Sequence, residues 1–344
     1  MLCPACALDQ LTPLADLGEM PVACGMTFPS PQAARTSLSG RMSLAHCAAC
    51  GHVANIAFDP QLGHFDATFE AALFHSPTYT AYATGVVDRL VKRYDLVGKK
   101  VLEVASGSPV LLAHLTDLGC EPTGVPGSDP EDGTFDLILA RFVLEHMADP
   151  GGLLTQLRKA SQRAFIEVPD AGYDLTTAGW DCIYPHVGYF GSTSLQALCA
   201  RTGWRIVESG KAFHDQYLWA EIEACAPTTP APAQVPPLEL TFAAATSHWQ
   251  TTLTGHKAVV WGAGTRGTMF CNRVDPRAGL IAGVVDRNPG KHGRFLPITG
   301  HRVLSPTDLT TLQPDTVILT NPAYRDEIAA ELATMDVTAT VLVA

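Results

Sequence analysis

The spacing of apolar and polar residues predicts alternating helices and strands in the middle of the chain, over residues 78–225. Segments with the three-to-four-residue spacing of a helix alternate there with short apolar runs that suit buried strands. This alternation is typical of a parallel sheet with helical crossovers. The predicted elements are a helix over 79–94, a strand over 101–104, a helix over 111–118, a strand over 135–140, a helix over 153–160 and a strand over 164–168.

The regions on either side have different patterns. Residues 1–70 show no long periodic run, and we expect a loop-rich module there. Residues 226–237 are rich in proline, which has no amide proton to donate, so this run predicts a linker. Residues 238–344 begin with a predicted helix over 238–253. The chain is therefore predicted to be an α/β protein with a small N-terminal module and two larger domains.

Composition and charge narrow the class of partner. The 344 residues are 47% hydrophobic, enough for two or three domains with cores, and the net charge is -11. No basic run is long enough to follow a phosphate backbone, so we expect no nucleic acid partner. No stretch reaches the roughly 18 apolar residues of a membrane helix, and the start lacks a signal segment. We expect a cytoplasmic protein that acts on a small molecule, with no membrane partner.

Cysteine spacing predicts a metal site in the N-terminal module. Four of the ten cysteines form two CxxC pairs, Cys3 with Cys6 and Cys47 with Cys50. Each pair places two thiolates on one tight turn, and two such turns complete the four-sulfur shell of a structural zinc ion. Because protein atoms fill all four positions, we expect this zinc to hold structure and do no chemistry. The alternative is a chance pairing in a segment rich in small residues.

A glycine-rich turn follows the first strand of the C-terminal domain. The predicted strand 257–261 leads into Gly262, Gly264 and Gly267, and a second strand ends just before Asp286. This is the dinucleotide-binding fingerprint, in which glycines let a pyrophosphate approach a helix N-terminus and the acid binds a ribose. Two interpretations stay open: a bound nucleotide moiety, or a Rossmann-like turn that needs glycine only for close packing of strand and helix.

Several stretches together carry a resemblance to a known family. They are 47–51 (CAACG), 74–77 (FHSP), 141–146 (RFVLEH), 180–190 (WDCIYPHVGYF), 214–219 (HDQYLW) and 285–294 (VDRNPGKHGR). Their order resembles that of the three-domain C-methyltransferases of deoxysugar and other natural-product pathways. The resemblance implies a zinc-binding module over 1–70, a class I methyltransferase (Rossmann-like) domain with a shortened sheet over 78–225, a linker over 226–237 and a Rossmann-like domain over 238–344.

Such enzymes remove a proton from the carbon beside a ketone on a nucleotide-linked sugar and methylate the enolate. By motif, the resemblance implies Tyr184 and His186, with Tyr189 nearby, as the base and its helpers, and Pro185 replaces the family's glutamate. The alternative is a half-buried polar pair in a loop. The run that ends in Glu145 and His146 lies near the end of a strand, on the side where ligands bind, but in the family it mostly shapes the following helix. A catalytic role is the alternative. The implied substrate contacts are Phe74, His75, Asp215, Gln216 and Tyr217.

The cofactor side departs from the family pattern. Glu103 and Gly107 remain as candidate contacts for S-adenosylmethionine, but Ala105 and Pro109 replace two of the glycines expected in this turn. The second strand should end in an acid that binds ribose hydroxyls, and no carboxylate stands at that point, 123–126 (TGVP). Only nine residues, 126–134, lead to the next predicted strand, and a parallel crossover needs a dozen or more.

These departures lead to three hypotheses. The first, which we expect, is an enzyme of a natural-product or sugar pathway that does acid–base chemistry next to a carbonyl without S-adenosylmethionine. Isomerisation, elimination or condensation of a nucleotide-linked sugar or carrier-bound carbonyl compound would fit. The second is an active S-adenosylmethionine-dependent C-methyltransferase that acts through an enolate. The third is a non-catalytic binding or scaffold protein.

Overall fold

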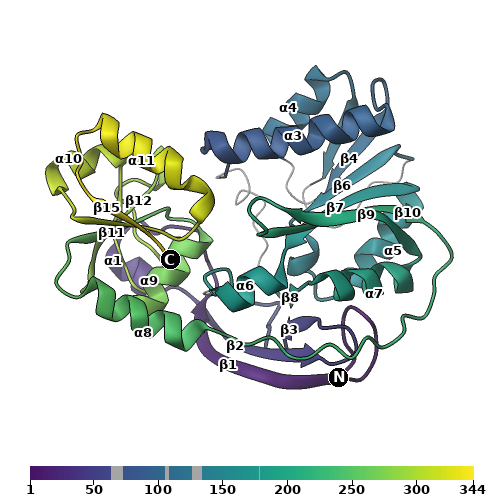
Figure 1. The fold of residues 1–344 in the computed structure, drawn as a ribbon, viewed down its shortest axis with the longest axis horizontal. Coiled ribbons are helices and arrows are strands. Elements are labelled where there is room, and N and C mark those ends of the chain that lie inside the picture. Colours follow the sequence, from purple (N-terminus) through teal and green to yellow (C-terminus); the bar gives the residue numbers. More distant parts are fainter. Residues whose placement is uncertain (63–72, 105–107, 126–133, 178) are drawn as a thin grey trace.

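The computed structural model describes residues 1–62, 73–104, 108–125, 134–177 and 179–344 (Figure 1). In these ranges the chain forms a four-stranded, a six-stranded and a five-stranded sheet, in that order along the sequence. The predicted α/β class is confirmed, with a four-cysteine module, a mixed sheet and a parallel C-terminal sheet. No helix in these ranges is long and apolar enough to cross a membrane.

The N-terminal module is built on two long antiparallel strands, β1 and β2, which the sequence analysis did not predict. Met42 and Leu44 are fully buried and alternate with polar residues that are less buried. This period of two is the pattern of a strand with one buried face. The elements of the module's sheet are β1 (Leu11–Pro21), α1 (Pro31–Arg35), β2 (Ser39–Cys47), β3 (Val53–Asn55) and β8 (Gly188–Tyr189), of which β8 comes from the middle domain.

The middle domain is a six-stranded sheet in the order β5-β4-β6-β7-β10-β9. The first four strands are parallel, and β10 runs antiparallel to both of its neighbours. The bounds are α3 (Pro77–Tyr94), β4 (Lys100–Val104), α4 (Pro109–Asp117), β5 (Glu121–Val125), β6 (Leu137–Arg141), η1 (Leu144–His146), α5 (Pro150–Ala160), β7 (Arg163–Pro169), α6 (Ala171–Thr177), α7 (Ser192–Thr202), β9 (Trp204–Ala212) and β10 (Tyr217–Ala224).

Helices cover both faces of this sheet (Figure 1). Helices α3 and α4 bury one apolar cluster against it, and α5 and α7 bury another on the opposite face. Strand β5 lies at one edge, and among the described residues no strand pairs beyond it. The sheet is thus short on the side where the sequence leaves little room for a further strand and helix.

The C-terminal domain is a parallel sheet in the order β13-β12-β11-β14-β15. Its apolar core joins α8 and α9 to the strands on one face, and α11 packs on the other. The bounds are α8 (Phe242–Leu253), β11 (Ala258–Trp261), α9 (Thr265–Val274), β12 (Ile281–Val285), η2 (Pro289–Lys291), β13 (Val303–Leu304), η3 (Pro306–Asp308), α10 (Leu309–Leu312), β14 (Thr316–Leu319), η4 (Pro322–Tyr324), α11 (Arg325–Thr334) and β15 (Thr340–Val343).

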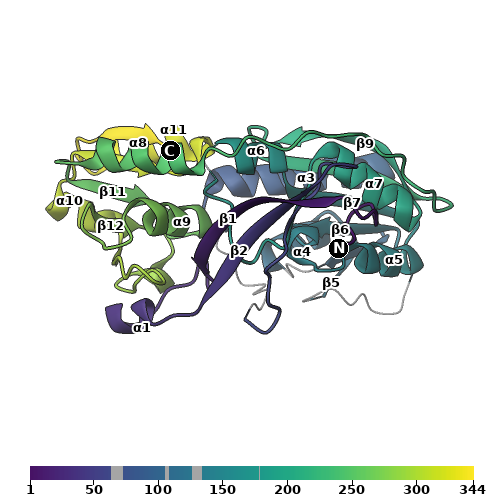
Figure 2. The ribbon, with the colours of Figure 1, turned by 90° about the horizontal axis from the view of Figure 1, so that it is seen from below.

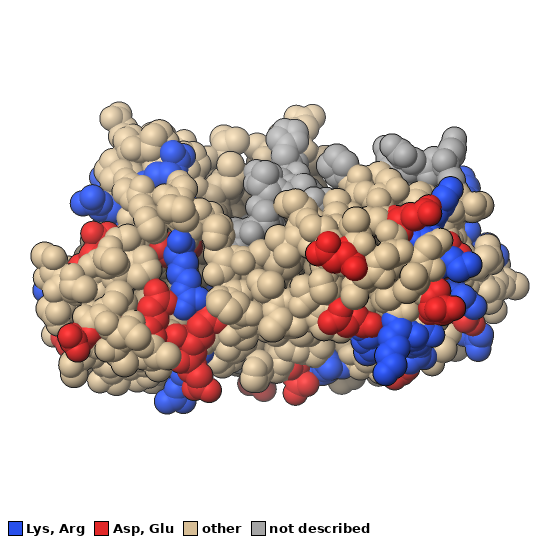
Figure 3. Space-filling view, turned by 90° about the horizontal axis from the view of Figure 1, so that it is seen from above, with Lys and Arg blue, Asp and Glu red and all other residues tan. Residues whose placement is uncertain are grey.

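The hairpin of the N-terminal module runs beneath both larger domains (Figures 1 and 2). At its far end the module reaches the C-terminal domain, where the Phe28 amide donates to the Phe295 carbonyl at 2.8 Å. The three parts therefore form one connected molecule. On the face seen in Figure 3, Lys and Arg lie beside Asp and Glu and form no continuous basic surface.

The proline-rich run forms neither helix nor strand, yet it is held in place. The amides of Ala233 and Val235 donate to the carbonyls of Ala49 and Ala48 at 2.7 and 2.8 Å. Those two carbonyls lie in the turn between Cys47 and Cys50. The run from the middle domain to the C-terminal domain is thus attached to the second cysteine turn.

Candidate functional site

A cavity of about 230 Å³ lies between the middle and C-terminal domains. One wall is formed by residues at and beyond the ends of β6 and β7, and the other by residues at the ends of β11, β12 and β14. The carboxyl ends of both parallel sheets therefore meet at this interdomain cavity. Ligands of α/β proteins bind at this edge, because helix N-termini leave unpaired amides there. The interdomain cavity is the candidate active site.

Two histidines and a glutamate stand together on the middle-domain wall. Glu145 and His146 lie in η1, directly after β6, and His186 lies in the loop before β8. One oxygen or ring nitrogen of each lies within 4.8 Å of those of the other two. The two imidazole centroids are 5.0 Å apart in an edge-on arrangement. The chain thus gathers three groups that can exchange protons or bind a metal.

Hydrogen bonding and burial fix the state of these histidines. His146 Nδ1 lies 2.9 Å from the Pro185 carbonyl oxygen. A carbonyl only accepts, so Nδ1 carries the proton and Nε2 keeps its lone pair. Burial lowers the pKa of both His146 and His186 to about 3, because a charged ring would lose its hydration. Both rings are therefore neutral near pH 7, and each keeps a lone pair on one ring nitrogen.

For His146, the sequence analysis gave a catalytic role as the alternative to shaping the next helix. That alternative rested on the place of the run near the end of a strand, where residues face the ligand-binding edge. Phe142, four residues earlier, has a left-handed backbone with φ of 53°. A non-glycine residue in that region is strained, and such strain is found most often at functional sites.

The two tyrosines predicted beside His186 lie away from the walls of the cavity. Tyr184 is fully buried, and its hydroxyl accepts a hydrogen bond from the Asp59 amide at 2.8 Å. The Tyr189 hydroxyl donates to Cys182 Sγ at 3.5 Å. Side chains from neighbouring positions thus have different surroundings. His186 faces the cavity, whereas the two tyrosines are buried and bind other parts of the protein through their hydroxyls.

Two of the predicted substrate contacts, His75 and Tyr217, line the cavity. The Tyr217 ring packs edge-on against Phe142 with centroids 4.7 Å apart. Burial raises the pKa of Tyr217 well above its ordinary value. Its phenol is therefore protonated near pH 7 and can donate a hydrogen bond to a ligand.

The other three predicted contacts have different positions. Gln216 is fully buried and donates to Asn321 Oδ1 at 3.0 Å, so it connects the middle domain to a cavity residue of the C-terminal domain. Phe74 packs edge-on against Tyr79 with centroids 5.3 Å apart. Asp215 is exposed in the turn before β10. Neither Phe74 nor Asp215 lines the cavity.

The glycine-rich turn forms part of the opposite wall. Gly262 has a φ of +106°, and a Cβ on Gly267 would lie 1.9 Å from the Gly262 carbonyl oxygen. The packing interpretation accounts for these two glycines. It does not account for Gly264, where a Cβ would meet nothing within 4 Å. Asp286 also lines the cavity and accepts a hydrogen bond from the Ala263 amide at 2.8 Å.

Three cationic side chains line the same wall, and the sequence analysis did not assign any of them a role. Each is paired with an acid in the structure. Each therefore attracts an anionic ligand less strongly than an unpaired cation would. The first amides of α9 have no partner within the helix and remain the element that favours an anion. The pairs are Arg266 with Asp181, Arg287 with Glu327 and Glu331, and Lys291 with Asp286.

Of the two residues predicted to contact S-adenosylmethionine, the structure describes Glu103. Glu103 is fully buried in β4. Gly107 and the connection 126–133 lie outside the described residues. Pro109 is the first residue of α4, after Ser108 at the N-cap. A helix leaves the amide at this position unpaired, so proline is tolerated there, and Pro109 is compatible with an intact strand-turn-helix.

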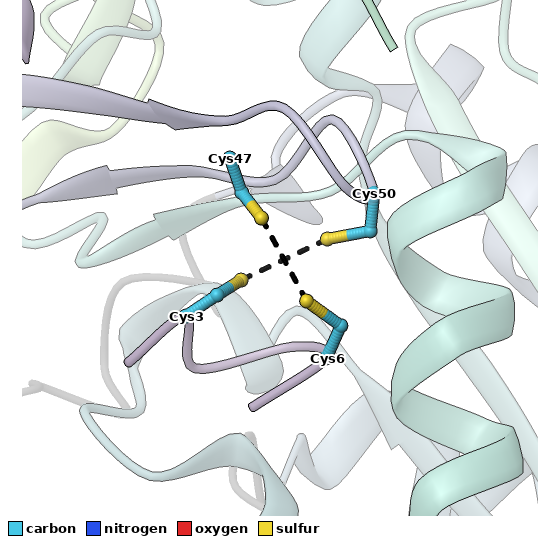
Figure 4. A group of neighbouring side chains, drawn as sticks. All are labelled: Cys3, Cys6, Cys47 and Cys50. Carbon is cyan, nitrogen blue, oxygen red and sulfur yellow. Dashed lines mark hydrogen bonds between the residues drawn. The ribbon is translucent and has the colours of Figure 1, made fainter. Parts of the chain in front are cut away.

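The four cysteines of the two CxxC pairs converge in the N-terminal module (Figure 4). Cys3 Sγ lies 3.7 Å from Cys50 Sγ, and Cys6 Sγ lies 3.7 Å from Cys47 Sγ. A zinc–sulfur distance of about 2.3 Å gives a tetrahedron edge of about 3.8 Å. All four side chains are buried. The cluster therefore has the ligands and the dimensions of a closed zinc site.

Two of the three parts of the chain match known protein families. Residues 78–209 match the family model for a methyltransferase domain, and residues 245–344 match the one for the C-methyltransferase C-terminal domain. No curated protein matches the chain.

Solved structures resemble the middle domain only distantly. An S-adenosylmethionine-dependent methyltransferase from Clostridium acetobutylicum is 8% identical, with a TM-score of 0.33 over 42% of this chain and 91% of that one. The CcbJ methyltransferase from Streptomyces caelestis is 14% identical, with a TM-score of 0.35 over 47% of this chain and 100% of that one. The magnesium protoporphyrin IX methyltransferase from Synechocystis, with bound S-adenosylmethionine, is 13% identical, with a TM-score of 0.31 over 43% and 80%. Likenesses this weak carry no functional argument.

The domain matches correct the expectation of acid–base chemistry without S-adenosylmethionine. That expectation gave too much weight to Pro109, whose place at the first turn of α4 does not disrupt the helix. Both matching domains belong to methyltransferases, so the findings support the alternative of a working methyltransferase. With its four-cysteine module, methyltransferase domain and C-methyltransferase C-terminal domain, the chain belongs to the C-methyltransferase family.

Proposed function

We propose that this protein is an S-adenosylmethionine-dependent C-methyltransferase that deprotonates the carbon beside a carbonyl of a small-molecule substrate and methylates that carbon. The observation that carries the proposal is the pair of neutral histidines, His146 and His186, on the wall of the interdomain cavity. Such a pair suits removal of a proton from carbon, which methylation at oxygen or nitrogen needs much less.

His186 is the proposed base. Its Nδ1 is buried and, among the residues that the structure describes, has no hydrogen-bond partner. A ring nitrogen of His186 takes the proton, and the electrons of the C–H bond form the enolate. His146 presents Nε2 beside it, and the protonated Tyr217 donates a hydrogen bond to the enolate oxygen, where negative charge develops.

S-adenosylmethionine supplies the methyl group when bound, and the described residues fit a donor site next to the cavity. The end of β4 pairs with the end of β6 at Val104 and Ala140, so β4 ends beside the strand that leads to His146. Ser108 and Pro109 begin α4 at this same edge. These residues would place the donor next to the proton-accepting histidine.

The proposed substrate is a nucleotide-linked sugar with a ketone, or another carrier-bound carbonyl compound. Its anionic carrier group would lie at the N-terminus of α9. Support comes from Gly264, which leaves open space at this end of the helix, and from Asp286, whose carboxylate faces the same cavity. Helix N-termini bind phosphate groups through unpaired amides.

We also propose that Cys3, Cys6, Cys47 and Cys50 hold one structural zinc ion. The sulfur separations fit a tetrahedral ion, and protein atoms fill the whole shell. The ion would fix the first residues of the chain to the end of β2.

Calorimetry with S-adenosylmethionine and its demethylated product tests the proposal. We expect saturable binding at one site per chain and a matching rise in melting temperature, since ligand at 100 times its Kd stabilises the folded state by about 2.7 kcal/mol. Absence of saturable heat and of any thermal shift at millimolar concentrations of both compounds would contradict it.

A further inference from the structure

We propose that Glu145, His146 and His186 form a second metal site, distinct from the cysteine cluster, which takes a divalent transition-metal ion and thereby blocks the interdomain cavity. The inference rests on the proposed function in one respect only: the ion would occupy the nitrogen that otherwise accepts the substrate proton.

The geometry comes close to that of a metal site. The three ligand atoms lie within 4.8 Å of one another. With metal–nitrogen and metal–oxygen distances of about 2.0 to 2.2 Å, the atoms around a tetrahedral ion are about 3.4 Å apart. Small side-chain rotations, which move each atom inward by about an ångström or less, would complete the site. Glu145 and His146 are adjacent in η1, and His186 approaches from a separate loop, so the ion would join two segments of the wall.

The surroundings of both imidazoles suit a metal. His146 Nδ1 donates to the Pro185 carbonyl at 2.9 Å, which directs Nε2 away from that carbonyl. Metal-binding histidines are typically held in this way, through the ring nitrogen that does not bind the ion. His186 is only 7% exposed, and its Nδ1 has no hydrogen-bond partner among the described residues. A buried ring nitrogen of this kind is costly unless something binds it.

Unlike the cysteine cluster, this site leaves one coordination position of the metal without a protein ligand. The four cysteines close their shell, whereas here three protein ligands line a cavity of about 230 Å³. The fourth position would hold water, as in open zinc sites, and the ion with its water would fill space that the carbonyl substrate needs. Occupancy would therefore compete with the carbonyl substrate. Competition with S-adenosylmethionine is not expected, because Glu103 and α4 lie outside the cavity walls.

The ligand set also selects the metal. Imidazole and carboxylate ligands suit Zn²⁺, Ni²⁺, Cu²⁺ and Fe²⁺, whereas Mg²⁺ and Ca²⁺ prefer oxygen alone. We expect Zn²⁺ and Ni²⁺ to bind and Mg²⁺ to have no effect at equal concentration.

Metal content after equilibrium dialysis of the full chain against Zn²⁺ tests the proposal without any activity. We expect two ions per wild-type chain, and one in His186→Asn and in His146→Asn. Each variant should lose more than the roughly 10-to-100-fold in affinity that a missing outer partner costs. His248→Asn on the exposed face of α8 is the matched control and should keep two. One ion in the wild type, or two in both cavity variants, would overturn the proposal.

A Co²⁺-substituted protein separates the two sites by spectrum. The second equivalent should add absorption without the thiolate charge-transfer band of the first, and Mg²⁺ should not displace it. If a second ion binds and no methyl transfer is found, only the proposed function fails. If methyl transfer occurs and Zn²⁺ at saturation of the second site does not compete with the carbonyl substrate, the blocking role is overturned.

Discussion

The two cavity histidines, His146 and His186, differ in their hydrogen-bond partners. His146 is oriented by the carbonyl of Pro185, at the position where the resembling family has a glutamate. Proline has no carboxylate to offer here, but its backbone carbonyl accepts from His146 and so fixes the tautomer of that ring. His186 has no such partner at Nδ1 among the described residues.

Replacing His186 by asparagine should lower kcat by about 10² to 10⁴, the usual contribution of a positioned base. The Kd for S-adenosylmethionine should remain nearly unchanged, because the residue lies on the substrate wall. Steady-state kinetics with an active substrate, together with calorimetry for the donor, check both statements.

Tyr184→Phe is the matched comparison. This change removes the hydroxyl that accepts from the Asp59 amide, so unfolding should become easier by about 0.5 to 1.5 kcal/mol while kcat is retained. Denaturant unfolding and the same kinetic assay measure the two effects. A loss of kcat as large as that of His186→Asn would show that the tyrosine takes part in the reaction.

The glycine-rich turn offers a second residue-scale prediction. Gly267→Ala should destabilise the protein by about 1 to 3 kcal/mol, because the new Cβ would lie 1.9 Å from the Gly262 carbonyl oxygen. Gly264→Ala meets nothing within 4 Å and should leave stability within about 0.5 kcal/mol of the wild type. Chemical denaturation of both variants tests this, and equal losses would contradict it.

At this scale, the sequence could predict which loop reaches the cavity. It could not predict the direction in which each side chain of that loop points. The motif around His186 identified the loop that reaches the cavity, but Tyr184 and Tyr189 in the same loop turn into the core. Side-chain direction in an irregular loop depends on contacts with Asp59 and other distant residues, which spacing does not encode. His146 was reachable from its place after a strand, but not from the loop motif.

At the scale of elements, the helices of the middle domain share a starting signal. Ser76, Ser108 and Asp149 are N-caps, and each is followed by proline. Proline suits the first helical position because its missing amide would be unpaired there. The sequence analysis started these helices two or three residues late, since it followed apolar spacing and did not use the cap–proline pair.

The attachment of the linker to the second cysteine turn leads to a prediction about metal removal. The Ala233 and Val235 amides bond to carbonyls of the turn that Cys47 and Cys50 would fix around zinc. Removing the ion with a chelator should therefore release residues 226–237 and speed their cleavage by a protease at least several-fold. Metal analysis and mass spectrometry of the fragments test this. Equal cleavage before and after zinc loss would contradict the coupling.

At the scale of the whole molecule, polar contacts hold the two larger domains around the cavity. Gln216 donates to Asn321, and Arg266 pairs with Asp181. Glu327 of α11 accepts from the Thr78 amide at 3.2 Å, in the first turn of α3. These contacts bring the two sheet edges together, and the candidate active site belongs to neither domain alone.

The contact between the two larger domains could not be predicted from the sequence. The parallel strands of the middle domain and the first two strands of the C-terminal domain could be predicted from their patterns, and the order of the domains from the resemblance. That His186 and the turn from Gly262 to Gly267 line one cavity depends on side-chain pairs between residues far apart in the chain, such as Arg266 and Asp181. Local pattern carries no information about such pairs.

The most direct test of the central claim is transfer from S-adenosylmethionine labelled with ¹³C in its methyl group. The full-length protein would be incubated with the labelled donor and a panel of nucleotide-linked keto sugars, and the products analysed by mass spectrometry and carbon NMR. We predict that the label appears on the carbon next to the carbonyl, bonded to carbon, and that His186→Asn abolishes most of it. Label on oxygen or nitrogen, or an unchanged yield with His186→Asn, would contradict the account.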